Sequence, residues 1–189
     1  YDRTDVVAGK TRKDYFYAGS LLYALEDFKG AVDNYSLMTD RTDSLGQIAN
    51  YQMGYSYIRT KNKVAAMQAF KDASAGSYDK AIQEDAYFNY AKLAFDLNND
   101  PSVFDSYIST YPSKAKGDKI YSYIALAALY NHDYAGAVEA YDKIDVLDED
   151  MKNNYIKANY LRADQLIEAG SYRKAVPCLK AAADYSDKR

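Results

Sequence analysis

The sequence has 189 residues, 48% of them hydrophobic and 27% charged, a composition that can bury a core and is not typical of disordered chains. The formal net charge is −3 and there is no basic stripe, so nucleic acid is not the expected partner. Only nine glycines and three prolines are present, which favours helices over strands. No apolar run reaches the roughly 18 to 20 residues that cross a bilayer, so no membrane span is expected.

In chain order, the sequence predicts five helical hairpins that share one spacing. The first helix of each carries a small residue, and the second helix carries a small or branched residue twelve positions later and a bulky residue four positions after that. Successive hairpins lie 35, 37, 34 and 38 residues apart, as expected for repeats joined by loops of variable length. The five sets are Gly19, Ala31 and Tyr35; Gly54, Ala66 and Phe70; Ala91, Val103 and Tyr107; Ala125, Ala137 and Tyr141; and Ala163, Ala175 and Leu179.

Turn-forming residues separate the two helices of every hairpin, at positions 26–28, 60–62, 98–101, 131–133 and 169–171. In the third turn, Asp100 can cap the following helix and Pro101 can begin it. The Tyr111-Pro112 pair is expected to end that helix, because a proline disfavours helical geometry in the residue before it. Pro177 lies inside the last predicted helix, so a late start, a kink or a frayed end is expected there.

The segment 49–73 shows the spacing most clearly, with Met53 and Gly54 followed by Tyr57, Ala66 and Phe70. It resembles the tetratricopeptide repeat (TPR), whose pattern runs from a Leu-Gly pair through Tyr to A-x-x-x-F. The resemblance implies an all-α fold. It would be an α-solenoid, a right-handed superhelix of about five antiparallel helix-turn-helix repeats, covering residues 1–189 as a single domain.

The N-terminal residues suggest a segment of a longer repeat array. Asp2-Arg3-Thr4-Asp5 recurs as Asp40-Arg41-Thr42-Asp43, which follows the second helix of the first hairpin. Neither end shows a clearly polar capping helix, which terminal repeats usually need. The alternative explanations are a chance match of four residues or a processed N-terminus.

No group of residues indicates catalysis, a metal site or a cofactor. Ala8-Gly9-Lys10-Thr11 is similar to the end of a phosphate-binding loop, but position 4 holds threonine where that loop needs glycine. His132, the only histidine, is expected in a solvated turn, and Cys178 in the core. The carboxylates of 142–150 lack the glycine of a calcium loop and are expected at a helix start. The sequence therefore predicts a protein that is not an enzyme.

Binding is expected on the concave wall that the first helices of a TPR solenoid form. In the family, the groove-facing positions lie six and three residues before the small residue, and one, four or five residues after it. The resemblance thus implies a partner-binding groove made by Lys13, Phe16, Ser20, Tyr51, Tyr55, Arg59, Phe88, Lys92, Lys119, Leu126 and Tyr160. The remaining groove positions hold Ile48, Asp85, Asp96, Ser122, Tyr130, Lys157, Asp164 and Glu168.

Aromatic residues of this groove alternate with cations, a combination found at binding hot spots. Replacing Tyr51 and Tyr55 together by Ala is expected to remove partner binding and to leave the melting temperature nearly unchanged. The alternative is that several of the rings pack against the neighbouring repeat, since helical spacing by itself also produces core stripes. Core packing is assigned to Gly19, Tyr35, Tyr57, Phe70, Tyr107 and Tyr141.

A protein or peptide is the expected partner, lying extended or helical against the aromatic residues. The clamp with which some TPR proteins hold a free C-terminal carboxylate is missing, because its places hold Phe16, Ser20, Gln52, Asp85 and Asn89. A glycan-binding or an RNA-binding helical-repeat module is the alternative. The acidic composition speaks against RNA, and the absence of tryptophan speaks against glycans.

The composition, rich in Tyr, Asn and Asp, is similar to that of TPR proteins of bacterial cell envelopes. This likeness favours a periplasmic or outer-membrane-associated location over a cytoplasmic one. The sequence does not indicate an oligomeric state or the identity of the partner.

Overall fold

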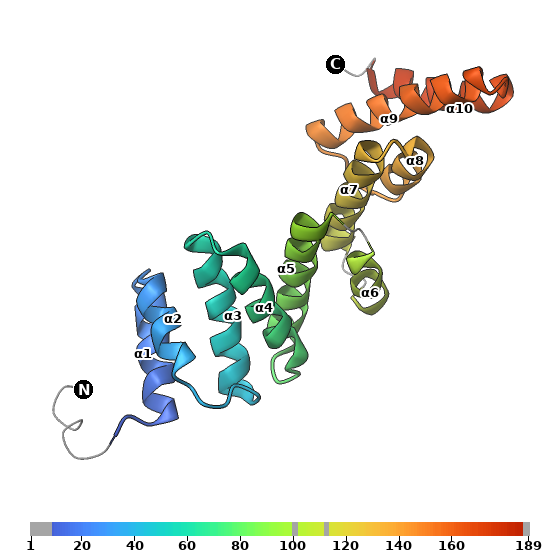
Figure 1. The fold of residues 1–189 in the computed structure, drawn as a ribbon. Coiled ribbons are helices and arrows are strands. Elements are labelled where there is room, and N and C mark those ends of the chain that lie inside the picture. Colours follow the sequence, from blue (N-terminus) through green and yellow to red (C-terminus); the bar gives the residue numbers. More distant parts are fainter. Residues whose placement is uncertain (1–8, 100–101, 112–113, 187–189) are drawn as a thin grey trace. The chain divides into compact units, whose positions relative to one another are not determined.

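The computed structural model of the chain describes residues 9–99, 102–111 and 114–186. These residues form ten α-helices and no strand (Figure 1), which confirms the expected all-α solenoid of antiparallel helical hairpins. The predictions made for Asp2 to Asp5, Asp100 and Pro101 lie outside the described residues. Helix α6 ends at Thr110 with Tyr111 extended, as the Tyr111-Pro112 pair predicts. In chain order the helices are α1 (Arg12–Ala24), α2 (Phe28–Ser36), α3 (Ser44–Arg59), α4 (Lys63–Ala75), α5 (Lys80–Asn98), α6 (Val103–Thr110), α7 (Lys114–Tyr130), α8 (Tyr134–Asp142), α9 (Glu149–Glu168) and α10 (Tyr172–Ser186).

The chain divides into two compact units, residues 1–99 and residues 100–189. Unit 1 contains α1 to α5 and unit 2 contains α6 to α10, and each unit has hydrophobic core clusters of its own. That residues 1–189 act as a single domain stays a prediction. Among the described helices, none combines the length and the apolar character that a membrane span requires.

In unit 1 the first helices of successive hairpins lie next to each other. Helix α3 packs against both α1 and α5, α2 packs against α1 and α3, and α4 packs against α3 and α5 (Figure 1). In unit 2, α7 packs against α9, α8 packs against both, and α10 packs against α9. Each of α2, α4 and α8 therefore packs against the first helix of its own hairpin and that of the next, as in a stack of helical repeats.

Small residues on the first helices let the bulky residues of the second helices approach the backbone. A Cβ atom on Gly19 would lie 2.6 Å from the Tyr35 ring, and one on Gly54 would lie 2.7 Å from the Phe70 ring. Both rings are fully buried. Of the other residues assigned to packing, Tyr107 and Tyr141 are buried, and Tyr57 is partly buried against two core clusters.

The fifth hairpin differs from the others at its bulky position. Leu179 is 38% exposed, whereas Ala163 and Ala175 are buried. Helix α10 begins at Tyr172 and continues through Pro177 to Ser186, so a late start at Pro177 is wrong. Pro177 lies in the second turn of the helix, where its missing N–H leaves one upstream carbonyl without its usual donor.

A single left-handed residue follows each first helix, namely Glu26, Lys61, Asn99, His132 or Gly170. After α1, the Glu26 N–H donates to the Tyr23 carbonyl and the Asp27 N–H donates to the Leu22 carbonyl, which is the Schellman arrangement. The same pair of bonds follows α3, α7 and α9. Asp27 then caps α2 by accepting from the Gly30 N–H at 2.9 Å.

Candidate protein-binding surface

The side of α1, α3 and α5 that carries most of the predicted groove residues of unit 1 is here named the first-helix face. Hydrogen bonds between side chains of α3 and α5 hold the centre of this face. Helical spacing places Lys13 on the same side of α1 as Ser20. In the same way, Lys92 lies on the same side of α5 as Asp85 and Asn89. Lys13 is exposed, and the other members are partly buried. The face consists of Lys13, Ser20, Tyr51, Tyr55, Asp85, Asn89 and Lys92.

Three hydrogen bonds converge on one carboxylate oxygen at the centre of this face. The Tyr51 hydroxyl donates to Oδ2 of Asp85 at 2.9 Å, and the Tyr55 hydroxyl donates to the same atom at 2.7 Å. The side-chain amide of Asn89 donates to it as well, at 2.9 Å. The tyrosines belong to α3 and their acceptor to α5, so the cluster fixes two neighbouring first helices to each other.

The protonation of the two tyrosines is fixed by their surroundings. Burial, together with hydrogen bonding to the Asp85 carboxylate, raises the pKa of both Tyr51 and Tyr55 above the ordinary value for a phenol. A phenolate would be repelled by the neighbouring carboxylate and would have no proton to donate to it. Both hydroxyls therefore remain donors at physiological pH, and the orientation of the rings does not depend on pH there.

Both rings also pack on the core below the face. Their centroids are 5.1 Å apart in an edge-to-face arrangement, and the buried Phe70 ring lies 5.1 Å from Tyr55 and 6.1 Å from Tyr51, again edge-to-face. The alternative interpretation was that several groove rings pack against the neighbouring repeat. The Tyr51 and Tyr55 rings instead pack on Phe70, which belongs to their own repeat. Replacing both by Ala would remove contacts to Phe70, so the expectation of nearly unchanged melting is corrected to a loss of stability.

A second polar link joins α1, α2 and α3. The hydroxyl of Tyr35 on α2 lies 3.0 Å from Ser20 Oγ of α1 and donates to the side-chain carbonyl of Gln52 on α3. Burial raises the pKa of Tyr35 to about 12. Sequence reasoning assigned this tyrosine to packing alone. The predicted groove also omitted Gln52 and Asn89. Both residues lie two positions before the small residue of their helix. A polar residue shared at this position could have identified them.

Of the three remaining predicted groove residues of unit 1, one lies in the core. Phe16 is only 8% exposed and belongs to the core with Ala31 and Tyr35, so its predicted place on the groove surface is wrong. Arg59 is exposed, but its guanidinium lies 4.9 Å from the centroid of the Phe28 ring at the start of α2. In this cation–π contact the positive charge of Arg59 interacts with a ring of the same chain. Phe88 is partly buried.

In unit 2, the predicted residues Lys119, Leu126 and Tyr160 are exposed, while Ser122 at a neighbouring groove position is buried. The ammonium of Lys119 lies 5.9 Å from the Tyr123 ring. Among the described residues of the unit, these predicted residues form no hydrogen bond or ring contact with one another.

The hydroxyl of Tyr141 has no partner in hydrogen-bonding geometry within the described part of the chain. In unit 1 the equivalent hydroxyl, that of Tyr35, bonds to Ser20 and Gln52, and the corresponding places in unit 2 hold Leu126 and Leu161. Burial raises the pKa of Tyr141 to about 12, against a smaller opposite effect of the nearby Asn154.

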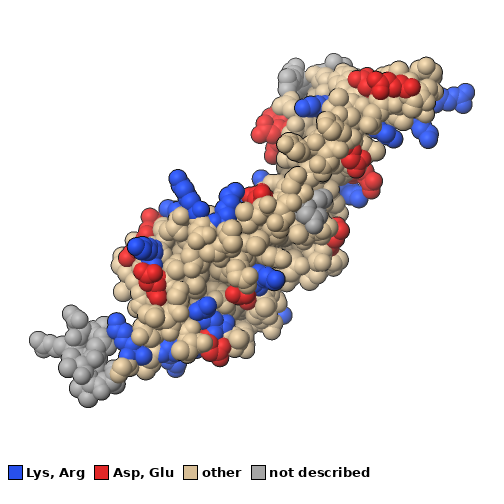
Figure 2. Space-filling model, viewed as in Figure 1, with Lys and Arg blue, Asp and Glu red and all other residues tan. Residues whose placement is uncertain are grey.

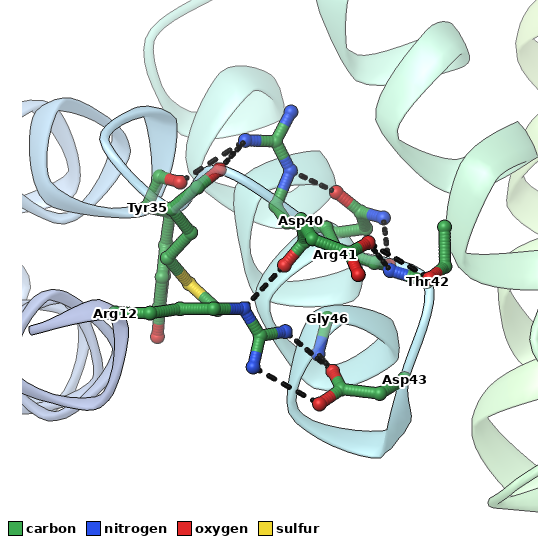
Figure 3. A network of polar contacts seen from close by, with 9 residues as sticks. Arg12, Tyr35, Asp40, Arg41, Thr42, Asp43 and Gly46 are labelled. Carbon is green, nitrogen blue, oxygen red and sulfur yellow. Dashed lines mark hydrogen bonds and ion pairs between the residues drawn. The ribbon is translucent and has the colours of Figure 1, made fainter.

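A separate polar network fixes the linker between α2 and α3 (Figure 3). The Arg12 guanidinium makes a bidentate pair with Asp43, at 2.9 and 2.5 Å, and lowers the pKa of that carboxyl. Arg41 donates to Asn50 Oδ1 at 2.9 Å, to the Tyr35 carbonyl in the last turn of α2, and to the Met38 carbonyl just after that helix. Beside the linker lies a pocket of about 560 Å³. These groups bond to each other, so the network has a structural role.

No group of three or more His, Cys, Asp and Glu residues that could hold a metal ion occurs in the described ranges. His132 is exposed in its turn as expected, with Nδ1 at 2.9 Å from the Tyr134 hydroxyl, and Cys178 is partly buried against a small cluster around Ala175. On the face drawn in Figure 2, acidic and basic residues are interspersed over both units without an extended patch of one sign.

No family model matches the sequence, and no curated protein matches it in sequence. Several solved structures are similar in fold. A crystal structure of MamA protein is 18% identical, with a TM-score of 0.57 over 96% of this chain and 94% of that chain. A second crystal structure of MamA is 18% identical, with a TM-score of 0.56 over 90% and 95% of the two chains. The chain shares the helical-repeat solenoid fold of these structures.

Proposed function

We propose that this chain is a non-enzymatic scaffold that binds a protein or peptide along the first-helix face of unit 1. The observation that carries the proposal is the cluster of Tyr51, Tyr55 and Asp85. Two partly exposed rings are held by Phe70 below them and by one carboxylate beside them. Because these rings already have a fixed orientation in the free protein, they lose little conformational entropy when a partner covers them. More of the free energy gained by burying their surface then contributes to affinity.

The residues around the rings indicate which partner would fit. An extended or helical peptide lying across α1, α3 and α5 would place apolar side chains against the tyrosines. Lys13 and Lys92, on the outer two of these helices, would favour acidic side chains at the ends of the bound segment. The MamA-like repeat fold supports protein interaction as the general role.

The test uses peptides selected from a random displayed library on the 189-residue chain, with affinity measured by calorimetry. The double variant Lys13→Glu with Lys92→Glu should weaken binding more than about tenfold, or roughly 1.4 kcal/mol. The control is Lys29→Glu with Lys71→Glu, which makes the same change of charge on the exposed surfaces of α2 and α4. An equal effect of the two pairs, or none from the first, would show that the face is not the binding site.

We also propose that the scaffold acts in a bacterial cell envelope, in the periplasm or at the outer membrane. The support is compositional, with 22 tyrosines and an acidic charge balance. Fractionation of cells that make the natural protein, followed with an antibody against this chain, tests the location. Recovery only with the cytoplasmic fraction would refute it.

A further inference from the structure

A pocket of about 410 Å³, here named the unit 2 pocket, is lined by residues of α6, α7 and α8. Its apolar part consists of Tyr121 and Ile124 of α7 and Ile108 of α6. Helix α8 contributes Gly136 and the methyl group of Ala140 beside them, and these small residues leave room for a large side chain. The inside of the pocket therefore suits an apolar group.

The two α7 residues are accessible although α7 has a second helix before it and another after it. Tyr121 lies four residues before the small residue Ala125, and Ile124 lies one residue before it. In α3 the same two positions hold Asn50 and Met53, which are only 5% and 6% exposed. Tyr121 and Ile124 are partly buried. The opening is thus a property of this hairpin and does not arise at an end of the chain.

The walls of the unit 2 pocket are held in place by ring contacts. On the α6 side, the fully buried Phe104 ring stacks on the Tyr123 ring of α7, with the centroids 5.9 Å apart. On the α8 side, the Lys143 ammonium lies 5.6 Å from the centroid of the Tyr121 ring and 3.1 Å from the Glu139 carboxylate. A site that is already formed loses less conformational entropy when a partner enters it.

Hydrogen-bond acceptors predominate among the exposed groups of the pocket. Asp105 and Glu139 supply carboxylates, and the Ser109 hydroxyl donates to the Ser106 carbonyl, so its oxygen is left as an acceptor. Lys143 supplies the only positive charge among the described residues that line the pocket, and it is paired with Glu139. The Asp105 side chain is exposed and makes no hydrogen bond or ion pair within the described part of the chain. A cation with several N–H donors would complement the α6 side.

We infer that the unit 2 pocket binds a protein segment through one large apolar side chain, and that an adjacent arginine of this segment pairs with Asp105. The five donors of a guanidinium suit the carboxylate and the neighbouring Ser109 oxygen. A protein segment fits better than a free small molecule, because Asp105, Ser109, Glu139 and Lys143 are all exposed, whereas small-molecule sites enclose roughly 70–90% of their ligand. The pocket shares no residue with the first-helix face, so it is a second contact site that is tested separately from the proposed function.

The probe is the acetylated and amidated tetrapeptide Gly-Phe-Arg-Gly, titrated into the isotope-labelled 189-residue chain while amide chemical shifts are recorded. The shifts should change in α6, α7 and α8, around Ile108, Tyr121 and Ala140. Two analogues test the recognised chemistry, one with Glu in place of Arg and one with Ala in place of Phe. Each should bind at least about fivefold more weakly, because the first loses the pair with Asp105 and the second loses the apolar anchor.

The variant Asp105→Lys should reverse the charge preference, so that the Glu analogue binds more tightly than the Arg peptide. The control is Asp150→Lys, which makes the same change of charge in the first turn of α9, outside the pocket, and should keep the preference for Arg. Circular dichroism checks that both variants keep their helical signal.

Three results would overturn the proposal: no binding of the Arg peptide up to its solubility limit, shift changes that lie outside α6, α7 and α8, or a preference for Arg that survives Asp105→Lys. Tighter binding of free benzylammonium than of the peptide would also overturn it, because the occupant would then be a small amphiphilic cation and not a protein segment.

Discussion

Gly54 determines how closely the two helices of the second hairpin approach. A methyl group there would lie 2.7 Å from the Phe70 ring, whereas at Gly117 in α7 no neighbouring atom lies within 4 Å of the corresponding position. Alanine is the better helix former at both sites by about 1 kcal/mol. The pair of sites therefore separates the effect of packing from that of helix propensity.

Gly54→Ala is predicted to lower the free energy of unfolding by about 1–3 kcal/mol, because the buried ring has no room to move away. Gly117→Ala should raise it, by up to about 1 kcal/mol. Urea unfolding followed by circular dichroism measures both values. If the two variants were equally stable, Gly54 would not be the contact position that the repeat spacing makes it.

Tyr51 and Tyr55 have a structural role in addition to their proposed binding role. Replacing both by Ala is predicted to reduce the free energy of unfolding by about 3 kcal/mol or more, because their rings cover Phe70. Replacing both by Phe keeps the rings and removes only the bonds to Asp85, so a smaller loss of about 1–2 kcal/mol is expected. Thermal unfolding distinguishes these results, and a double Ala variant as stable as the unmodified chain would contradict the packing.

At this scale the sequence located the rings but not their partners. Repeat spacing identified Tyr51 and Tyr55, because a face of a helix follows from period alone. It could not show that both hydroxyls bond to Asp85, since that depends on how α3 and α5 are placed side by side. Phe16 was misassigned for the same reason: its burial depends on how α1, α2 and α3 pack together, and its ring lies in their shared core, 6.2 Å from the Tyr35 ring.

The turns are the most regular elements of the chain. A left-handed residue follows each first helix, yet four of the five are Glu26, Lys61, Asn99 and His132 rather than glycine. A residue with a side chain is less favourable in this conformation by about 1–2 kcal/mol, partly offset by the greater flexibility of glycine in the unfolded chain.

Lys61→Gly is therefore predicted to raise the free energy of unfolding by about 0.5–1 kcal/mol, and Gly170→Ala to lower it by a similar amount. Chemical unfolding of both variants checks the signs.

The sequence located these turns from their polar residues. It did not predict the left-handed residue, because Glu and Lys seldom adopt that conformation. A stabilising Gly170→Ala would contradict the turn geometry.

For the whole molecule, several tyrosines whose pKa is raised by burial make stability depend on alkaline pH, among them Tyr35 in unit 1 and Tyr141 in unit 2. The pKa values of Tyr35 and Tyr141 are raised to about 12 in the folded state, above the value of about 10 for an unfolded chain. Their contribution to stability is complete below pH 10 and is lost as the pH rises toward 12, because the unfolded chain releases these protons first.

The free energy of unfolding should accordingly fall between about pH 10 and pH 12, and less steeply in the variant Tyr141→Phe. At pH 7 this variant should be as stable as the unmodified chain or more so, since it removes a buried hydroxyl that lacks a partner. Urea unfolding at a series of pH values measures both effects. A slope that Tyr141→Phe leaves unchanged would contradict the assignment.

The five hairpins were predictable because every repeat has nearly the same spacing of small and bulky residues. A repeat that matches the pattern weakly can therefore still be identified from its distance to the others. The division into residues 1–99 and 100–189 was not. It depends on how the helices pack in three dimensions, whereas the spacing of small residues is nearly the same on both sides of the third turn.

The central claim is that a partner lies on the first-helix face of unit 1. The most direct measurement is the change in amide chemical shifts when the isotope-labelled chain binds a library-selected peptide. The largest changes are predicted in α3 and α5, around Tyr51, Tyr55, Asn89 and Lys92. If they instead lay along the outer surfaces of α2 and α4, or only in unit 2, the claim would be contradicted.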